Sequence, residues 1–188
     1  MSTYYDVTTD TFRCLYPHLF EPSKFEGDEG DGEYSLIMVF DKPEQLKPLK
    51  EAIRKTVAEK WPKGAPQGLR SPFRDGGEKA AEWGDFLAGK VFVRAKTKRP
   101  PLVMDQKTAN LLDKSAIYSG CYCRASVCPF VYDKAGNRGV GLRLNAVQLV
   151  RDGEPLGGQS QEALRSQFVP VEDAAQPPVF DPSELDEI

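Results

Sequence analysis

The sequence lacks several features from which enzymes and membrane proteins are commonly built. Its 188 residues include one histidine, His18, and no apolar run approaches the length that a membrane-spanning helix needs. The N-terminus has neither the basic start nor the apolar stretch of a secretory signal. We therefore expect a cytoplasmic protein without histidine-based catalysis, in which the four cysteines remain thiols.

Basic residues are absent from the end of the chain. All 25 Lys and Arg precede Val171, whereas residues 171–188 carry six acids. The rest of the chain is therefore basic, with 25 bases against 22 acids, although the formal net charge of the whole is −3. A segment with one sign of charge and few apolar residues cannot offset the entropy cost of folding. We expect one domain over residues 1–160, followed by a flexible linker and a disordered acidic tail over residues 161–188.

The expected tail ends in a small apolar motif among acids. We interpret this motif as a partner-binding element made of Phe180, Leu185, Asp186, Glu187 and Ile188. A tethered acidic arm can also lie on the basic surface of its own domain. The remaining alternative is a solvating tail that only keeps the protein in solution.

Apolar periodicity predicts a mainly β domain with one helix. Leu46, Leu49 and Ile53 recur at helical spacing, in a segment that begins near Asp41 and ends at Trp61. The predicted strands and helices do not alternate, which argues against a doubly wound fold. We therefore expect an α+β protein with an antiparallel barrel or sheet. Residues 16–33 and 63–89 are rich in glycine, proline or acids, and we expect them to be surface loops. Residues 133–139 are expected to form a turn. Strands are expected at residues 6–16, 34–40, 90–98, 118–132 and 140–150.

Two of these strands combine aromatic rings with cations on one face. In the strand at 90–98, Phe92 has the same parity as three cations, and no acid occurs between Asp85 and Asp105. The strand at 118–132 repeats this composition. Rings that stack on bases, interleaved with cations that neutralise phosphates, are what a binder of single strands needs. The alternative is a solvated face whose lysines discourage aggregation. The predicted nucleic-acid-binding residues are Phe92, Arg94, Lys96, Lys98, Arg99, Tyr122, Arg124, Phe130, Tyr132, Arg138 and Arg143.

The cysteines do not have the spacing of a closed zinc site. Cys121 and Cys123 face the same way on a strand, Cys128 falls on the opposite face, and Cys14 is distant in the sequence. A tetrahedral site would tolerate this only with a bulge, and free cysteine is a common small core residue. We therefore expect no metal and no other cofactor.

Several segments resemble a known family. The run from YSGCYCR through GNRGVGLRLNAVQ to RDGEPLGG, together with LRSPFRDGGEKA and FEPSKFEG followed by YSLIMVF, is similar to the small single-stranded DNA-binding proteins of tailed bacteriophages. The similarity covers roughly residues 10–158. It implies an OB-fold, the five-stranded barrel that binds oligonucleotides across its strands. It also implies a role in phage DNA replication or recombination in the host bacterial cytoplasm, and no catalytic residues.

The sequence thus predicts a non-enzymatic protein that binds and protects single-stranded DNA without reading its sequence. Its tail would contact a phage DNA polymerase, helicase or recombinase, or compete for the DNA groove. One alternative is a protein-interaction module that does not bind nucleic acid. A metal-dependent nuclease using the acids at 26–33 is a third interpretation.

Overall fold

The computed structural model describes residues 4–24, 30–111 and 113–156. The predicted linker and tail, including Phe180, Leu185, Asp186, Glu187 and Ile188, lie outside these described residues. Within them, no helix has both the length and the apolar character needed to cross a bilayer. The elements are β1 (Val7–Thr8), β2 (Phe12–Ser23), β3 (Glu33–Phe40), α1 (Lys47–Lys60), β4 (Phe73–Asp75), α2 (Ala80–Trp83), β5 (Val91–Thr97), β6 (Leu102–Met104), β7 (Tyr122–Lys134) and β8 (Asn137–Arg151), with short 3-10 turns at 43–46, 76–78, 85–87 and 114–116.

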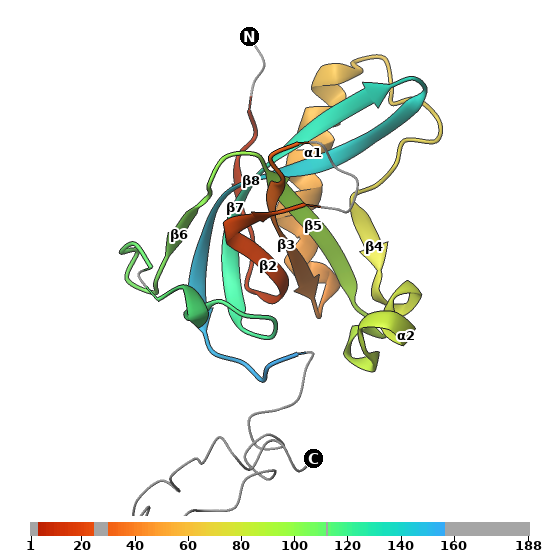
Figure 1. The fold of residues 1–188 in the computed structure, drawn as a ribbon. Coiled ribbons are helices and arrows are strands. Elements are labelled where there is room, and N and C mark those ends of the chain that lie inside the picture. The colour runs from red at the N-terminus through yellow and green to blue at the C-terminus, as the bar shows by residue number, and fades with distance from the viewer. Residues whose placement is uncertain (1–3, 25–29, 112, 157–188) are drawn as a thin grey trace, which may run out of the picture. The chain divides into compact units, whose positions relative to one another are not determined.

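Five strands close into a ring in the order β2, β3, β5, β8 and β7, with β7 pairing back to β2 (Figure 1). This ring confirms the predicted five-stranded barrel. Four of its pairings are antiparallel, as expected, but β5 and β8 run parallel. The long path from β5 through β6 and β7 to β8 makes this possible, since parallel neighbours need an extended crossover.

The central strand β3 is buried on both faces, which explains its nearly continuous apolar sequence. Leu36, Met38 and Phe40 point into the main core inside the barrel. Ile37 and Val39 point outward into a second, smaller apolar cluster. The barrel therefore has a covered outer face as well as a filled interior.

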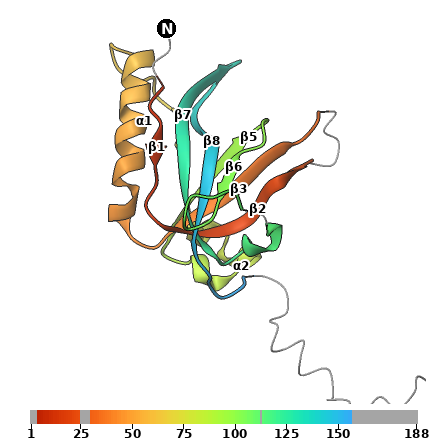
Figure 2. The ribbon, with the colours of Figure 1, turned by 90° about the vertical axis from the view of Figure 1, so that its left-hand side faces the viewer.

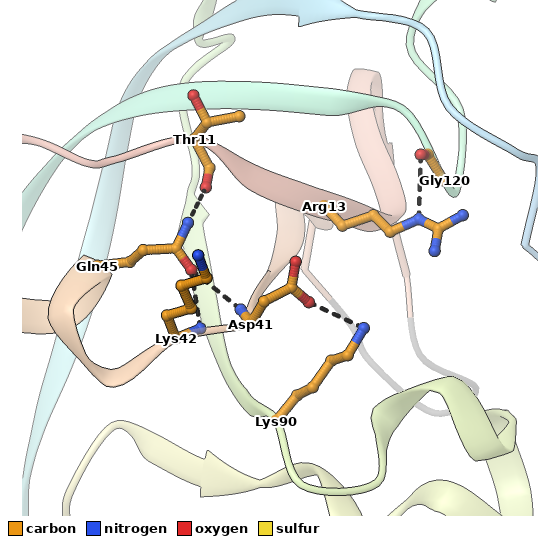
Figure 3. Close-up of polar contacts among 7 residues, drawn as sticks. All are labelled: Thr11, Arg13, Asp41, Lys42, Gln45, Lys90 and Gly120. Atoms are coloured by element: carbon orange, nitrogen blue, oxygen red, sulfur yellow. Dashed lines mark hydrogen bonds and ion pairs between the residues drawn. The ribbon is translucent and has the colours of Figure 1, made fainter.

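The predicted helix is confirmed as a 3-10 turn followed by α1, which lies beside β1 and β7 (Figure 2). Leu46 and Leu49 are buried in the main core, and Ile53 packs against it. The polar residues before the helix fix the corner between β3 and the helix (Figure 3). The Gln45 amide donates to the Thr11 carbonyl at 2.9 Å and accepts from the Asp41 amide at 3.1 Å, while the Asp41 carboxylate pairs with Lys90 at 2.8 Å.

Two segments that we predicted to be surface loops are structured. Strand β2 continues past Tyr16 to Ser23. A register shift after Leu15 and a φ of 45° at Tyr16 mark an irregularity within the strand that does not end it. The segment 63–89 contains β4 and α2, and its Leu87 is completely buried. This segment covers part of the outer face of the barrel, so the prediction of an external excursion was wrong there.

The hairpin of β7 and β8 is the longest paired element, and it projects from the barrel in Figure 1. Pairing continues to Lys134 and Asn137, so the predicted turn at 133–139 is too long. The two turn residues, Ala135 and Gly136, both have positive φ, at 50° and 82°. Such a two-residue turn follows the right-handed twist of the flanking strands and extends their ladder.

Candidate nucleic-acid interface

A groove of about 920 Å³ lies where the end of β5 meets the hairpin strands. In the view of Figure 2, the tips of β2–β3 and β7–β8 diverge from the barrel, and the end of β5 lies between them. We call this cavity the main groove. It is lined by Tyr4, Glu33, Lys96, Thr97, Lys98, Arg99, Pro100, Phe130, Arg143, Leu144 and Asn145. Five of these eleven lining residues were predicted from the sequence to bind nucleic acid: Lys96, Lys98, Arg99, Phe130 and Arg143.

Strand register explains why these side chains meet although they are distant in the sequence. The parallel pairing of β5 with β8 sets Lys96 directly beside Arg143. The antiparallel pairing of β8 with β7 sets Arg143 opposite Cys128, two residues from Phe130. Burial raises the pKa of the Cys128 thiol, which therefore stays neutral in the core next to the groove. The ring of strands thus gathers cations from two elements around one aromatic residue.

The two hairpin rings are each supported by a glycine directly across the strand pair. Phe130 pairs with Gly141, and Tyr132 pairs with Gly139. A Cβ built on either glycine would collide with the opposing ring, so both rings occupy the space that a side chain would fill. Phe130 remains 38% exposed in this position. It is a fixed aromatic surface open to solvent, as stacking requires.

The main groove carries mostly positive charge. Glu33 is the one acid among its lining residues, and its carboxylate pairs with Lys96 at 2.9 Å. The Arg143 guanidinium lies 5.0 Å from the centre of the Tyr4 ring, within cation–π range. Lys98 and Arg99 are exposed at the end of β5. Four cations therefore share the groove with two exposed rings, Tyr4 and Phe130, and one acid.

A second cavity of about 370 Å³, which we call the side groove, has Gly141 in its lining. It contains three more predicted residues, Phe92, Arg94 and Tyr132. The Arg94 guanidinium lies 3.5 Å from the Ser35 hydroxyl. The complete lining is Ser71, Pro72, Arg74, Glu78, Lys79, Trp83, Phe92, Arg94, Tyr132, Val140 and Gly141.

Phe92 corrects the prediction of an exposed ring. It shares the outer face of β5 with Arg94 and Lys96, as the alternation indicated, but it is only 7% exposed. Trp83 packs on it with ring centres 5.3 Å apart, and Leu87 lies in the same apolar cluster. Because the segment 63–89 folds over this half of the strand, Phe92 is a core residue at the edge of the side groove.

The remaining predicted residues lie elsewhere. Tyr122 is at a different end of the barrel, where the Arg151 guanidinium is 3.6 Å from its ring centre. This contact covers one face of the ring. Arg124 is exposed on β7 opposite Gln148 and lines neither groove. Arg138 pairs with Asp133 at 2.9 Å near the hairpin turn.

Among the aromatic and basic residues that line the grooves, sequence reasoning missed four, namely Tyr4, Arg74, Lys79 and Trp83. Three of them belong to the segment 63–89, whose glycines and prolines obscured any period. Lys79 and Trp83 are four residues apart, which is the spacing of neighbours on a helical turn, and the Lys79 ammonium lies 5.3 Å from the Trp83 ring. Lys79 also donates to Glu82 at 2.6 Å, and this bond lowers the pKa of the Glu82 carboxyl. The spacing of ring and cation was therefore a usable signal.

Comparison with protein families identifies one match that spans most of the chain. The family model described as the single-stranded DNA-binding protein of Enterobacter phage Enc34 matches residues 5–176. A curated protein, p50 of Acyrthosiphon pisum secondary endosymbiont phage 1, is 30% identical over 164 residues, which are 81% of this chain and 86% of that protein.

Solved structures with the same fold include two phage single-stranded DNA-binding proteins. The protein of bacteriophage Enc34 in complex with single-stranded DNA superposes with a TM-score of 0.65 at 21% identity, covering 84% of this chain and 95% of that one. The protein gp2.5 of bacteriophage T7 gives a TM-score of 0.60 at 18% identity, covering 93% of this chain and all of that one. At these identities the structures show a shared fold.

Proposed function

Since this chain belongs to the family of the Enterobacter phage Enc34 single-stranded DNA-binding protein, we propose that it binds single-stranded DNA in the main groove. The observation that carries this proposal is the arrangement of four cations, Lys96, Lys98, Arg99 and Arg143, around the exposed ring of Phe130. The cations neutralise phosphates, and the ring stacks on a base. Neither interaction distinguishes one base from another, so the protein binds any sequence.

The side groove extends the DNA path. Gly141 lines the side groove, and its cross-strand partner Phe130 lines the main groove, so the two cavities meet at this strand pair. A single strand of DNA that extends beyond Phe130 would reach Tyr132 and Arg94 next. Trp83, with Lys79 beside it, supplies a further ring and cation at the far end. This path passes over Phe92 without stacking on it.

The biological role that fits this binding is protection of single strands during phage DNA replication or recombination, in the cytoplasm of the infected cell and without catalysis. The acidic segment 171–188 would act on the same surface. Its six acids, tethered to a basic domain, compete with phosphates for Lys and Arg. A polymerase, helicase or recombinase that captures Phe180 and residues 185–188 would free the groove while docking the protein at the replication machinery.

Titration of fluorescent oligo(dT) at several salt concentrations tests the proposal. Each phosphate contact on a single strand contributes a slope of about −0.7. For an oligo(dT) short enough to occupy only the main groove, the four cations there predict a slope of about −3 in a plot of log affinity against log salt. A protein-interaction module would show no binding or a flat response. Duplex DNA of the same length should bind more weakly, because paired bases are not free to stack on Phe130.

A further inference from the structure

Three of the four cysteines meet inside the barrel. The sulfur atoms of Cys14, Cys121 and Cys123 all lie within 4.8 Å of one another, and those of Cys121 and Cys123 are 3.6 Å apart. All three residues are completely buried. The nucleic-acid-binding surface described above uses none of them.

The closure of the barrel between β2 and β7 creates this cluster. Cys121 and Cys123 share a parity, so both sulfur atoms point into the barrel. The pairing of Phe12 with Cys123 and of Arg13 with Tyr122 brings Cys14 next to Cys121. The Cys14 amide donates to the Cys121 carbonyl at 2.8 Å. Sequence spacing alone placed Cys14 at a distance and grouped the pair with Cys128 instead.

We propose that Cys14, Cys121 and Cys123 form a binding site for a thiophilic monovalent ion, Cu⁺, held by three sulfur atoms. A metal–thiolate bond is about 2.3 Å long, so three sulfur atoms around one ion in a plane are on the order of 4 Å apart. One observed separation is 3.6 Å and none exceeds 4.8 Å, so small rotations of the side chains complete the site. The proposal concerns a site separate from the DNA grooves.

The number and type of donors select the ion. Soft thiolates favour Cu⁺ and Zn²⁺, but structural Zn²⁺ is almost always four-coordinate. Among the residues that the structure describes, no fourth His, Cys, Asp or Glu joins the group. The three cysteines have no solvent exposure, so bulk water has no open path to a fourth position. Cu⁺ is satisfied by three sulfur atoms, and its oxidation state does not change on binding.

Proton release accompanies binding, because a thiol must ionise to become a thiolate ligand. With two thiolates and one thiol, the bound Cu⁺ carries a net charge of −1 and two protons leave. A bound ion would also join β2 to β7, where the barrel closes. Since a ligand that binds only the folded state stabilises it, the melting temperature should rise with Cu⁺.

The test uses the full-length chain, kept reduced and free of oxygen. A thiol titration of the denatured protein first establishes that all four cysteines are reduced. Cu⁺ is offered in the presence of the competing chelator bicinchoninate, and stoichiometry, thiolate-to-copper absorbance in the ultraviolet and melting temperature are recorded. We expect one Cu⁺ per chain, three sulfur neighbours by X-ray absorption, and a raised melting temperature. Cys14→Ala, Cys121→Ala and Cys123→Ala should each weaken binding at least tenfold.

Cys128→Ala is the matched control, since Cys128 is equally buried but lies outside the cluster, and it should bind Cu⁺ like the parent chain. Failure of the parent chain to take Cu⁺ from the chelator would overturn the proposal without any variant having to fold. Equal loss of binding in Cys128→Ala would also overturn it. A Co²⁺ complex with a tetrahedral absorption spectrum would show a fourth ligand and contradict the three-sulfur site.

Discussion

Phe130 reaches over Gly141, its partner across the β7–β8 strand pair, so closely that a Cβ at position 141 would lie 2.5 Å from the ring. An aromatic residue opposite a glycine can fold across the bare backbone, which holds the ring against the sheet. Tyr132 and Gly139 repeat the arrangement one step along the hairpin. The glycines are therefore positioning residues for the rings that we propose to stack on bases.

Gly141→Ala should weaken oligo(dT) binding by a factor similar to that of Phe130→Ala, because the added methyl group displaces the ring. The two substitutions should not be additive, since the second has nothing left to displace. Affinities of the two single variants and the double variant, measured by fluorescence anisotropy, form the test. Gly30→Ala, where a Cβ meets no atom within 4 Å, is the control. Full affinity in a folded Gly141→Ala protein would show that the ring position does not matter.

Phe130 and Phe92 should respond oppositely to truncation. Phe130→Ala removes an exposed ring and should cost about 1–3 kcal/mol of DNA-binding free energy with little change in melting temperature. Phe92→Ala opens a cavity in a buried cluster and should cost about 3–5 kcal/mol of folding stability, with the affinity of the folded fraction retained. Thermal unfolding and DNA titration of both variants measure the two effects. The reverse pattern would mean that the DNA path lies over Phe92.

Glu33→Gln should tighten DNA binding at low salt. The substitution keeps the shape of the side chain but removes the acid from the main groove and releases Lys96 from its ion pair. Lys96 already counts among the four phosphate contacts, so the salt slope should stay near about −3 while the affinity rises, because the carboxylate no longer competes with phosphate for Lys96. Glu51→Gln breaks a comparable pair, with Lys55 on α1 at 3.0 Å, and should leave binding unchanged. If both substitutions act equally, the effect reflects net charge and not the groove.

Deletion of residues 171–188 should also tighten binding, and the gain should shrink as salt rises. We proposed that the six acids compete with phosphate for the same cations, and exposed charges are screened over about 10 Å at 0.1 M salt. Titrations of the full-length and shortened chains at low and high salt measure the difference. Equal affinities at low salt would leave the segment with a docking or solubility role.

The sequence predicted the individual strands and the helix better than the pairing of the strands and the burial of their side chains. The alternation in β5 and the spacing of Leu46, Leu49 and Ile53 are local patterns, and the structure confirms both. The parallel pairing of β5 with β8 depends on residues almost fifty positions apart, and no local pattern encodes it. This pairing nevertheless decides that Lys96 and Arg143 line the same groove.

The same limit applies to burial. Parity correctly placed Phe92 on the outer face of β5, but parity cannot tell whether another segment covers that face. The covering segment contributes Trp83 and Leu87 through a short helical turn among glycines, where no periodicity predicted an apolar contact. The cysteine cluster required the register of β2 against β7, which the sequence does not reveal either.

The most direct test of the main groove compares two triple variants of equal charge. Lys98→Ala, Arg99→Ala and Arg143→Ala together remove three cations from the groove, whereas Lys47→Ala, Arg54→Ala and Lys60→Ala remove three exposed cations from α1, which lies beside β1 and away from the β2–β3 tip in Figure 2. The measurement is the salt dependence of oligo(dT) affinity for both proteins and the parent chain. We predict that the groove variant loses about two units of slope, from about −3 to about −1, while the α1 variant keeps the parent slope. Equal slopes for the two triple variants would contradict single-stranded DNA binding in the main groove.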